Sequence, residues 1–380
     1  MFTLGRNYCS TSPEYAWIWQ QPEWPVFDWD NTVISSLLRE AHFNQGLLLG
    51  RMGLENQEQA TLDTLLANIV HSSAIEGEKL NAFSVRSSLA NKLGIKEEQQ
   101  YPTTEQTNGL AEMMIDAITQ LDQPLSLERI LRWHELLFPV GYTLVNPVQG
   151  EVLRGDTLMQ VVSGRIDKPT VHFEAPPRDI LETELQHFIR WFNDSRSDAE
   201  LDPLLRAAIT HLWFVTLHPL DDGNGRITRL LTDLALAQGE KLSIRFYAMS
   251  VSILEKKKSY YEILEQTQKG EMDITPWLVW FLTTLNDTLL SSMQMIEQTV
   301  AKTNFWRNVD QTKLSTEQVK VLNRLLDGDF EAGINSSQYQ KVSKVSRATA
   351  TRHLAYLVEL GFLSKTDAGG RSTRYVIRYE

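Results

Sequence analysis

The sequence predicts a mainly α-helical protein that contains one β-hairpin and ends in a small separate module. Three observations support this prediction. Apolar residues recur at helical spacing through most of the chain, an alternating pattern interrupts them once near the middle, and basic residues gather near the C-terminal end. A chain of 380 residues can form two or three domains. We expect a helical N-terminal domain at 1–100, a central domain at 101–305 and a small module at 312–380.

Helical spacing occurs in nine segments, in which apolar residues lie three or four positions apart. These segments are 34–52, 62–75, 105–121, 127–137, 180–192, 203–217, 227–237, 250–264 and 274–300. Ser126 and Asp179 precede two of them, and their side-chain oxygens can accept hydrogen bonds from the free N–H groups of a first turn. We therefore expect two helices to begin directly after these residues.

Two stretches interrupt the helical pattern. Residues 13–30 hold four tryptophans, which either form a platform for a ligand or cover an apolar surface, and we expect packing. Residues 150–177 alternate over 158–163, turn over 164–169 and alternate again over 171–173, which predicts a β-hairpin. An exposed strand of this hairpin can pair with an extended segment of another protein.

The composition limits the cellular setting and the partners. The sole cysteine, Cys9, excludes an internal disulfide and fits a reducing cytosol. No run of about 18 apolar residues is present, and the first residues lack the apolar core of a signal peptide. We therefore expect a cytoplasmic protein without a membrane span. The net charge of −11 argues against binding of the whole molecule to nucleic acid or to an anionic membrane.

The charge is distributed unevenly along the chain. Residues 313–380 contain eleven Lys or Arg and seven Asp or Glu, a balance of +4, while the rest of the chain carries −15. A basic module on an acidic body indicates that the module has a partner of its own. Its pattern is typical of a winged helix. The expected elements are helices at 315–326, 336–342 and 346–360 and a hairpin at 363–377.

The last helix and the hairpin of this module carry residue types that contact DNA. Arg and Thr side chains reach base edges and phosphates from a recognition helix, and arginines on a wing contact the DNA backbone. The candidate DNA-binding residues are Arg347, Thr349, Arg352, Arg371 and Arg374. Winged helices also bind proteins, so both kinds of partner stay open.

The most informative stretch is 218–229, His-Pro-Leu-Asp-Asp-Gly-Asn-Gly-Arg-Ile-Thr-Arg, between two apolar helices. A glycine-rich turn that opens a helix offers free N–H groups to a phosphate, and Arg226 and Arg229 lie one turn apart and can grip the same group. Asp222 can hold Mg²⁺ against that phosphate. His218 can take a proton from a hydroxyl, because the pKa of an imidazole is near neutral. The loop therefore predicts a nucleotide site with a base beside it.

This loop resembles the signature of the Fic family, His-x-Phe-x-(Asp/Glu)-Gly-Asn-Gly-Arg-x-x-Arg. Every polar position matches, and Leu220 replaces the usual Phe at a position that faces the core in the family. The resemblance implies a Fic-type helical core with a hairpin flap, and a protein adenylyltransferase that transfers AMP from ATP to Ser, Thr or Tyr hydroxyls of target proteins or of itself. His218 is then the catalytic base, and Asp222 is the ligand of Mg²⁺. The implied phosphate-binding residues are Gly223, Asn224, Gly225, Arg226 and Arg229.

The resemblance also implies roles outside the loop. The family's flap holds the target segment over the base, and its adenine pocket is lined by a tyrosine pair that follows a polar residue. The implied flap residues are Val161, Val162, Ser163, Gly164 and His172. The implied adenine-site residues are Lys256, Tyr260 and Tyr261, although Lys256 stands where the family often has Asn.

A further match lies upstream, in Ser72-Ser-Ala-Ile-Glu76-Gly77, which resembles the family's inhibitory motif (Ser/Thr)-x-x-x-Glu-(Gly/Asn). In the family's arrangement, the carboxylate of Glu76 would pair with Arg229 where a γ-phosphate must lie, and ATP would bind in a pose unsuited to transfer. Ser72 begins this motif. Because Glu76 precedes the loop in the same chain, the inhibition would be built into the protein.

Other functions stay open. Reaction at the γ-phosphate gives a kinase, a water oriented by Glu76 gives removal of AMP, and a DNA-binding regulator whose Fic body only senses ATP needs no reaction. His211 is expected in the core, because no further Cys or His lies at ligand spacing. The tryptophan-rich segment and the helix at 274–300 could offer a surface for a homodimer.

Overall fold

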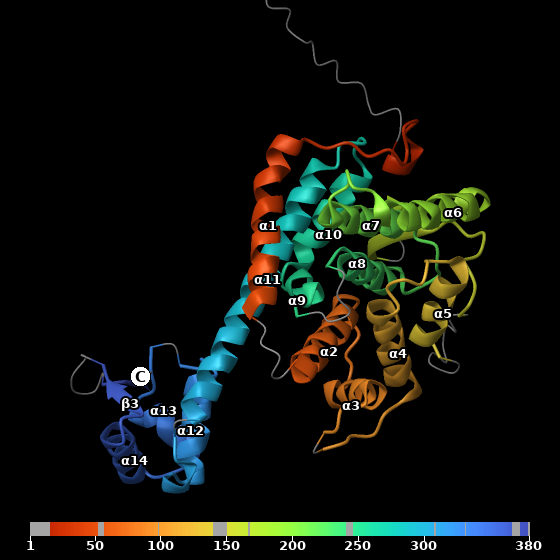
Figure 1. Cartoon of the computed structure of the whole chain (residues 1–380). Helices are drawn as coiled ribbons and strands as arrows, with labels where there is room; N and C mark the ends of the chain where they lie inside the picture. Colours follow the sequence, from red (N-terminus) through yellow and green to blue (C-terminus); the bar gives the residue numbers. More distant parts are fainter. Residues whose placement is uncertain are drawn as a thin grey trace, which may run out of the picture. The chain divides into compact units, whose positions relative to one another are not determined.

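The fold was analysed in a computed structural model (Figure 1). The structure describes residues 16–51, 57–97, 99–139, 150–165, 168–240, 246–307, 309–330, 332–366 and 373–378. The chain divides into two compact units, Met1–Leu290 and Ser291–Glu380. Among the described residues, no helix combines the length and the apolar character needed to cross a membrane. The predicted mainly α-helical class is confirmed.

The first unit consists of helices and one hairpin. Its elements are η1 (Ile18–Gln20), α1 (Asn31–Arg51), α2 (Gln57–Ile75), α3 (Ala82–Leu93), α4 (Glu105–Thr119), α5 (Leu127–Leu137), β1 (Gln160–Arg165), β2 (Lys168–Glu174), α6 (Arg178–Asp194), η2 (Ser195–Ser197), α7 (Pro203–Leu217), α8 (Asn224–Glu240), α9 (Met249–Glu255), α10 (Lys257–Gln268) and the first part of α11 (Thr275–Arg307). All nine predicted segments are helical in the structure with shifted boundaries, although the segment at 250–264 forms two helices and the segment at 274–300 continues into the second unit.

The centre of the first unit is the pair α7 and α8. Every residue from Leu204 to Leu217 is buried in α7, and α8 is buried from Arg226 to Gln238. Helices that are buried along almost their whole length must be surrounded by other elements, and Figure 1 shows α7 and α8 inside the first unit. Only six residues, 218–223, connect them, so the loop that the sequence singled out is held at the ends of two rigid helices.

Three local predictions need correction. Helix α3 was missed, because three serines, Ser84, Ser87 and Ser88, share its buried face with the apolar residues. The predicted helix at 250–264 is two helices, since the backbone leaves the α-conformation at Lys256. Asp179 lies inside the first turn of α6, and Pro177 is the residue before that helix. The capping role predicted for Ser126 is confirmed, as its side chain accepts from the N–H of Arg129.

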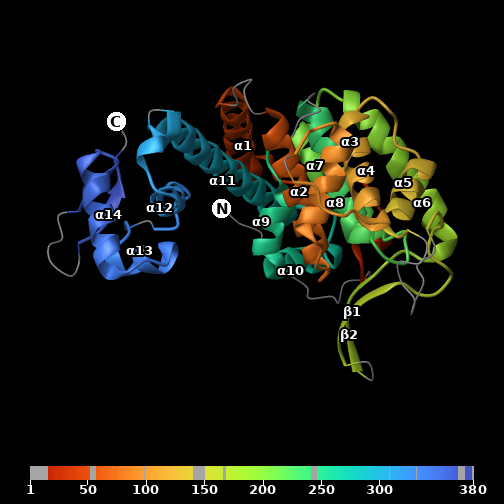
Figure 2. The same cartoon turned by 90° about the horizontal axis from the view of Figure 1, so that it is seen from below.

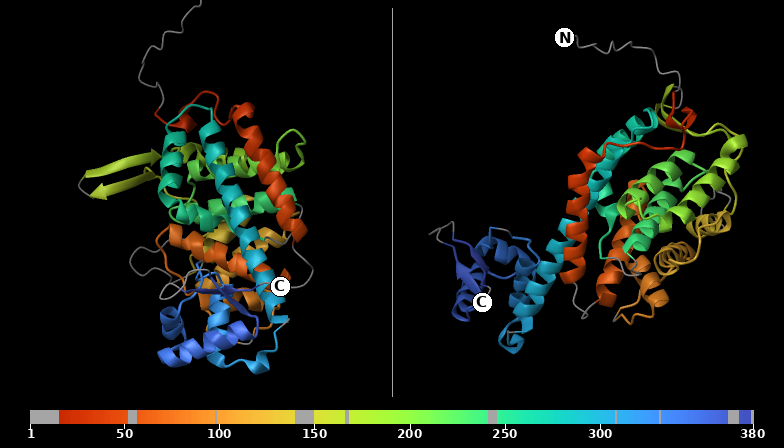
Figure 3. Two further views of the ribbon diagram at one scale, coloured as in Figure 1. Left: turned by 90° about the vertical axis from the view of Figure 1, so that its left-hand side faces the viewer. Right: turned by 45° about the horizontal axis from the view of Figure 1, so that its top comes forward.

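The tryptophan-rich segment packs on the first unit, as predicted. Trp24 makes an edge-to-face contact with Trp213 of α7, and its indole N–H donates to Glu184 at 2.8 Å. The segment after it leads into α1, which lies beside the first part of α11, where Asn44 donates to Asn286 (Figure 3). The aromatic side chains therefore fasten the N-terminal segment to the helical core.

The predicted hairpin is present and extends from the helices of the first unit (Figure 2). Strands β1 and β2 pair antiparallel, from Gln160 opposite Glu174 to Arg165 opposite Lys168, with a bulge between Val161 and Val162. Apart from each other, these strands have no sheet partner within the described part of the chain.

The second unit contains the end of α11, η3 (Gln311–Lys313), α12 (Thr316–Leu326), α13 (Ser336–Ser343), α14 (Arg347–Glu359), β3 (Leu363–Lys365) and β4 (Tyr375–Ile377). It has a core of its own, which includes Phe305 from the last turns of α11. The compact unit begins at Ser291, because the end of α11 packs with it. Residues on both sides of position 100 belong to the other compact unit.

Candidate active site

His218 ends α7 and is held in an unusual backbone conformation. Its φ is +48°, in the left-handed region, and its N–H caps the helix by donating to the carbonyl of Phe214. The ring is half-buried, and its Nδ1 donates to the carbonyl of Val215 at 3.2 Å. This bond leaves Nε2 as the proton acceptor. Burial lowers the pKa of His218 below its usual 6.5, and the nearby cation Arg154 acts in the same direction. The ring is therefore neutral at pH 7 and able to act as a base.

The loop after His218 is closed by Asn224. Its side chain accepts from the N–H of Leu220 at 2.9 Å and donates to the carbonyl of Leu220 at 2.7 Å. Leu220 is fully buried, which agrees with the expected core-facing position. Because both ends of the Asn224 amide are used within the loop, its side chain does not face a phosphate. The Asn224 side chain therefore holds the turn in shape, and the predicted contact of its backbone N–H with a phosphate stays a prediction.

Two glycines leave room at the start of α8. Gly223 has a φ of +82°, and a Cβ there would lie 2.7 Å from Leu137. A Cβ on Gly225 would overlap Oε1 of Glu76 and approach Nη1 of Arg229 to 3.1 Å. Glycine is therefore required at both positions. The open side of Gly225 is where an anion meets the N-terminus of α8.

That open side is taken by the carboxylate of Glu76. Oε1 of Glu76 lies 2.7 Å from Nη2 of Arg229, whose side chain is 3% exposed. Arg229 also donates from Nε to Oγ of Ser72 at 2.8 Å and from Nη2 to the Ser72 carbonyl at 2.9 Å. Ser72 and Glu76, which the sequence predicted to act together, thus bind the guanidinium of Arg229 through three acceptor oxygens.

The charge of Glu76 follows from these contacts. Burial raises the pKa of its carboxyl group, but the opposing effects of Arg229, with smaller ones from Arg226 and Lys257, keep the pKa below its usual value. The pKa of Arg229 is raised, because the attraction of Glu76 outweighs the burial that lowers it. Both groups are therefore charged at neutral pH, and the site holds a full ion pair beside Gly225.

The sequence reasoning missed a second carboxylate, Glu78. Its Oε2 lies 2.8 Å from Nη1 of Arg226, and its other oxygen accepts from Gln106. Arg226 is 7% exposed and stacks over the ring of Phe138, with 4.8 Å from Cζ to the ring centroid. The two acids on either side of Gly77 therefore bind the two arginines of the loop. In the sequence, only the Glu-Gly-Glu spacing at 76–78 indicated that a second acid could act beside Glu76.

Asp222 fits the chemistry of a Mg²⁺ ligand. Its side chain is 58% exposed, and Oδ1 accepts from the N–H of Gly223 and lies 3.5 Å from Nη2 of Arg226. An accessible carboxylate retains lone pairs for a cation. The described residues contain no cluster of three or more possible metal ligands. A single carboxylate agrees with the way Mg²⁺ is usually bound, by one or two carboxylates together with substrate phosphates.

The residues expected around an adenine ring differ in their burial and in their partners, although the rings of Tyr260 and Tyr261 are in contact. Tyr260 is fully buried and its hydroxyl meets Nε2 of His211 at 2.8 Å. Burial lowers the pKa of His211 to about 3, so it is a neutral core residue, as expected. Lys256 pairs with Asp287 of α11. Tyr260 and Lys256 are therefore held in other contacts, and their role at an adenine ring stays a prediction.

Tyr261 and the neighbouring Lys257 lie closer to the site. The Tyr261 ring is 40% exposed and its hydroxyl lies 3.5 Å from the carbonyl of Ile75, next to Glu76. Nζ of Lys257 lies 5.9 Å from the centroid of that ring. Burial and the negative charge of Glu76 raise the pKa of Tyr261 to about 12, so its hydroxyl is neutral. This ring is the one of the pair that can face a nucleotide base.

The predicted flap is tied to the first unit by His172. Its Nε2 lies 2.6 Å from Oγ of Ser163 across the hairpin, and its Nδ1 lies 2.7 Å from Oε2 of Glu265 in α10. His172 and Ser163 thus serve the hairpin itself. Val161 and Val162 are exposed, and they remain the side chains of the flap that can touch another protein. Gly164 is exposed too, with a φ of +92°.

Arg154 joins the flap to the catalytic loop. This residue is 2% exposed, and its Nε donates to the carbonyl of His218 at 2.9 Å. Its guanidinium also donates to the carbonyl of Pro176, and its backbone N–H donates to the carbonyl of Pro219 at 3.0 Å. Both ends of the hairpin segment are therefore fixed against the residues around the base.

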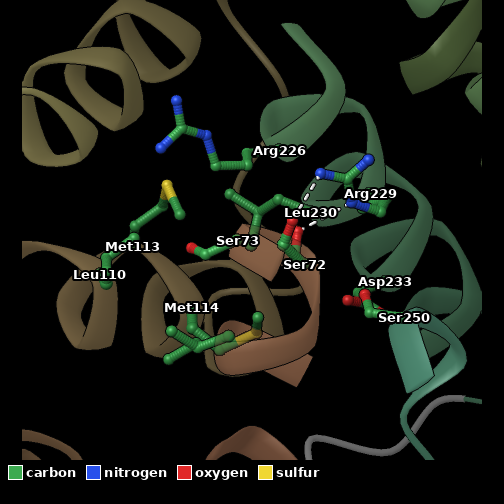
Figure 4. Close-up of a pocket in the computed structure, with 11 residues that line it drawn as sticks. Ser72, Ser73, Leu110, Met113, Met114, Arg226, Arg229, Leu230, Asp233 and Ser250 are labelled. Atoms are coloured by element: carbon green, nitrogen blue, oxygen red, sulfur yellow. Dashed lines mark hydrogen bonds between the residues drawn. The ribbon is translucent and has the colours of Figure 1, made fainter. Parts of the chain in front are cut away.

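A small pocket lies between α2, α4, α8 and α9 (Figure 4). In Figure 4 the two arginines leave α8 on either side of Leu230, and Arg229 is bonded to Ser72. Met113 and Met114 form an apolar wall on the α4 side. Glu76 and Gly225 do not line this pocket, but Ser72, Arg226 and Arg229 do, so the pocket adjoins the ion pair.

The candidate DNA-binding residues divide into two groups. Arg347 and Arg352 are exposed on α14. Thr349 is half-buried near the N-cap Ser346, with 3.0 Å between their hydroxyl oxygens. Arg374 donates to the carbonyl of Gly333 at 2.8 Å, so its guanidinium serves the second unit itself. Arg371 lies outside the described residues.

Comparisons with known proteins agree with this geometry. Residues 124–236 match the Fic/DOC family, and residues 17–95 match a domain of unknown function, DUF4172. Three curated relatives are named protein adenylyltransferase Fic, from Drosophila sechellia, Drosophila simulans and Drosophila melanogaster. Each is 28% identical over 221 residues, which cover 58% of this chain and 40% of the relative. The chain therefore spans about two fifths of the length of these relatives.

Two solved structures share the fold. A Fic family protein from Desulfovibrio desulfuricans G20 is 19% identical, with a TM-score of 0.51, and the match covers 95% of this chain and 99% of that one. Fic-1 from C. elegans is 21% identical, with a TM-score of 0.51, and the match covers 71% of this chain and 74% of that one. At these identities the likeness concerns the fold.

Proposed function

We propose that this chain, which contains a Fic/DOC domain at residues 124–236, transfers AMP from ATP to hydroxyl groups of proteins and is held back by Glu76. The Fic/DOC domain and the adenylyltransferase relatives support a nucleotidyltransferase class of activity. The observation that carries the finer proposal is the ion pair of 2.7 Å between Glu76 and Arg229, set against Gly225 beside a neutral His218.

His218 acts as the base in this proposal. Because Nδ1 donates to the carbonyl of Val215, the lone pair of Nε2 is free to accept a proton. The base takes the proton of a Ser, Thr or Tyr hydroxyl while the oxygen attacks the α-phosphorus of ATP. The bond from that phosphorus to its bridging oxygen breaks, and pyrophosphate leaves with the electron pair. The low pKa of His218 keeps the base unprotonated at neutral pH.

The start of α8 holds the phosphates. The backbone N–H groups after Gly223 and the positive end of the helix attract an anion. Arg229 and Arg226 supply two guanidinium groups that are largely buried and therefore interact strongly with phosphate oxygens. Fixed donors of this kind stabilise the charge that builds up during transfer.

Asp222 is the residue that would hold Mg²⁺. When bound, the ion would neutralise charge on the phosphates and on the departing pyrophosphate. The accessible carboxylate at the entrance of the anion site supports this assignment. Val161 and Val162 on the exposed hairpin would hold the target segment, by adding it as a further strand beside β1 or β2.

Glu76 restrains the reaction by occupying the seat of the outer phosphate. Its carboxylate takes the donors of Arg229 and fills the space beside Gly225. A negative group in that position both blocks and repels a phosphate. ATP can then bind only with its phosphates displaced, and the α-phosphorus is not aligned with the hydroxyl.

The position of the transferred label tests this function. The Glu76→Gly variant is incubated with Mg²⁺ and with ATP labelled at the α- or at the γ-phosphate. The proposal expects α-label on protein and none from γ-labelled ATP, and it expects Glu76→Gly/His218→Ala to incorporate neither. Label from the γ-phosphate means a kinase, and no label from either means a protein that only senses ATP; each result overturns the proposal.

A further inference from the structure

We propose that the second unit binds double-stranded DNA through the exposed face of α14. This inference concerns residues outside the Fic/DOC domain and does not depend on AMP transfer. It rests on the arrangement of three helices and a small sheet, on the composition of one helix face, and on the distribution of unpaired cations.

The arrangement presents α14 outward. Helix α13 and helix α14 are joined by three residues, of which Lys344 has a left-handed φ of +55° and Ser346 caps α14 by accepting from the N–H of Thr349. After α14, β3 pairs with β4, and Tyr375 of β4 also pairs with Ile334, which lies between α12 and α13. This order resembles a winged helix-turn-helix, in which the last helix enters the major groove.

The buried side of α14 fixes its orientation. Ala350, Leu354 and Leu357 are buried in the core of the second unit. His353 meets the hydroxyl of Tyr339 at 3.0 Å, which ties α14 to α13. Because these residues lie on one side of the helix, the opposite side must face solvent or a partner.

That opposite side has the composition of a surface that contacts a polyanion. Its exposed residues are Arg347, Ala348, Thr351, Arg352, Ala355 and Tyr356. The face carries two guanidinium groups and two further hydrogen-bonding side chains, and its first acidic residue, Glu359, stands at the last position of the helix. The two alanines leave the backbone accessible, so the helix can approach bases closely. An α-helix of about 10–12 Å diameter fits a major groove of about 12 Å.

Unpaired cations surround this face. Over 332–366 and 373–378, Glu359 is the single acidic residue, against seven Lys or Arg. Five of these cations make no ion pair within the described part of the chain: Lys341, Lys344, Arg347, Arg352 and Lys365. Elsewhere in the unit, Arg324 pairs with Asp329 and Lys302 pairs with Asp327. Cations left without partners on one face indicate an anionic ligand.

Duplex DNA accounts for this face better than other anions do. A duplex presents phosphates on both sides of a groove that admits a helix, which matches guanidinium groups on α14 flanked by lysines of α13 and of the turn. Duplex RNA has a deep, narrow major groove that side chains cannot read. The contact set is therefore refined from the sequence prediction: Thr351 replaces Thr349, and Lys341 and Lys344 replace Arg374, whose guanidinium is bound inside the unit.

Fluorescence anisotropy of the full chain with a labelled DNA duplex of mixed sequence tests the proposal. Binding should weaken steeply as salt rises from about 50 to about 200 mM. The Arg347→Ala/Arg352→Ala variant should bind about ten-fold or more weakly and should lower the slope of log K against log salt by about 2, since each lost phosphate contact contributes about 0.9. Both side chains are exposed, so the fold should persist, and circular dichroism checks this.

Two matched variants complete the experiment. Lys320→Ala removes an exposed cation of α12, and His218→Ala changes only the first unit; both should bind DNA as the unaltered chain does. The proposal is overturned by absence of binding at low salt, by equal weakening in Lys320→Ala, or by unchanged binding in the double variant. Tighter binding of an acidic protein or of duplex RNA than of DNA would also overturn it.

Discussion

The carboxylate of Glu76 and the guanidinium of Arg229 form an ion pair of 2.7 Å between residues 153 positions apart in the sequence. The pair lies against Gly225, at the start of the helix that carries Arg229. An acid that follows α2 thus lies at the start of α8. In the proposed function this ion pair competes with a phosphate for the same donors, so a change in either partner should change what the site can bind.

The overlap between Gly225 and Glu76 gives a test that does not need activity. Gly225→Ala should lower the free energy of unfolding by about 1–3 kcal/mol, because the new methyl group meets the carboxylate. In a Glu76→Gly background the same change should cost at least about 1 kcal/mol less, a coupling measured by urea denaturation of all four proteins. Gly46→Ala is the control, since a Cβ there meets nothing within 4 Å and shows no coupling with Glu76. Equal costs in both backgrounds would contradict the placement of Glu76.

Glu78 is expected to position Arg226. Glu78→Gln should destabilise the protein by about 1–3 kcal/mol, because it weakens a largely buried charged bond. In the Glu76→Gly background it should raise the KM for ATP several-fold with a smaller change in kcat, and Glu78→Asp should restore part of the affinity. Glu112→Gln is the control, since that carboxylate makes exposed ion pairs with Lys92 and Arg132, and it should cost less than about 1 kcal/mol. An unaltered KM in Glu78→Gln would rule out the positioning role.

The pH dependence of transfer should report on His218. Burial lowers the pKa of this imidazole, so its neutral form persists below pH 6.5. A base must be unprotonated, and the transfer rate of Glu76→Gly should therefore rise with pH and reach half of its maximum below pH 6.5. Removal of Glu76 also removes a negative charge that raises this pKa, which moves the midpoint further down. A rate that falls as pH rises from 5 to 7 would exclude a neutral histidine base.

The hairpin should become mobile without His172. This ring connects Ser163 on β1 with Glu265 on α10, so His172→Ala removes both bonds. Limited proteolysis within β1 and β2 should become several-fold faster while the helical core stays resistant, because local opening costs less than global unfolding. Thr170→Ala, on the same strand and exposed, is the control and should leave the cleavage rate unchanged. Unchanged cleavage in His172→Ala would mean that the strand pairing alone holds the hairpin.

Much of the fold could be predicted because its signals are local. The spacing of apolar residues located the helices around the core, and alternation located β1 and β2. Helix α3 was not predicted, because its buried face is partly polar. The hydrogen bonds of its buried serines are satisfied by Pro102, Tyr101, Thr107 and Asn108. The break between α9 and α10 arises because the backbone of one residue, Lys256, leaves the α-helical conformation. The spacing of apolar residues does not reveal such a change.

The candidate site was predictable where its residues form a recognisable motif, as the loop and the Ser72–Gly77 segment do. The loop at 218–229 contains its own chemistry, whereas Glu78 acts on Arg226 across 148 positions and is visible only in the fold. The same holds for Lys256, which the fold pairs with Asp287, and for Arg374, which bonds to Gly333. Charged side chains near a site in sequence are therefore poor guides until their partners are known.

The most direct test of the central claim is the rate at which the α-phosphate label of ATP enters protein, measured for the unaltered chain, Glu76→Gly and Glu78→Gln at equal concentration with Mg²⁺. If Glu76 occupies the seat of the outer phosphate, Glu76→Gly should incorporate label at least about ten-fold faster than the unaltered chain, a gain of about 1.4 kcal/mol in transition-state free energy. Glu78→Gln should show no increase. Equal rates in the unaltered chain and in Glu76→Gly would contradict the account.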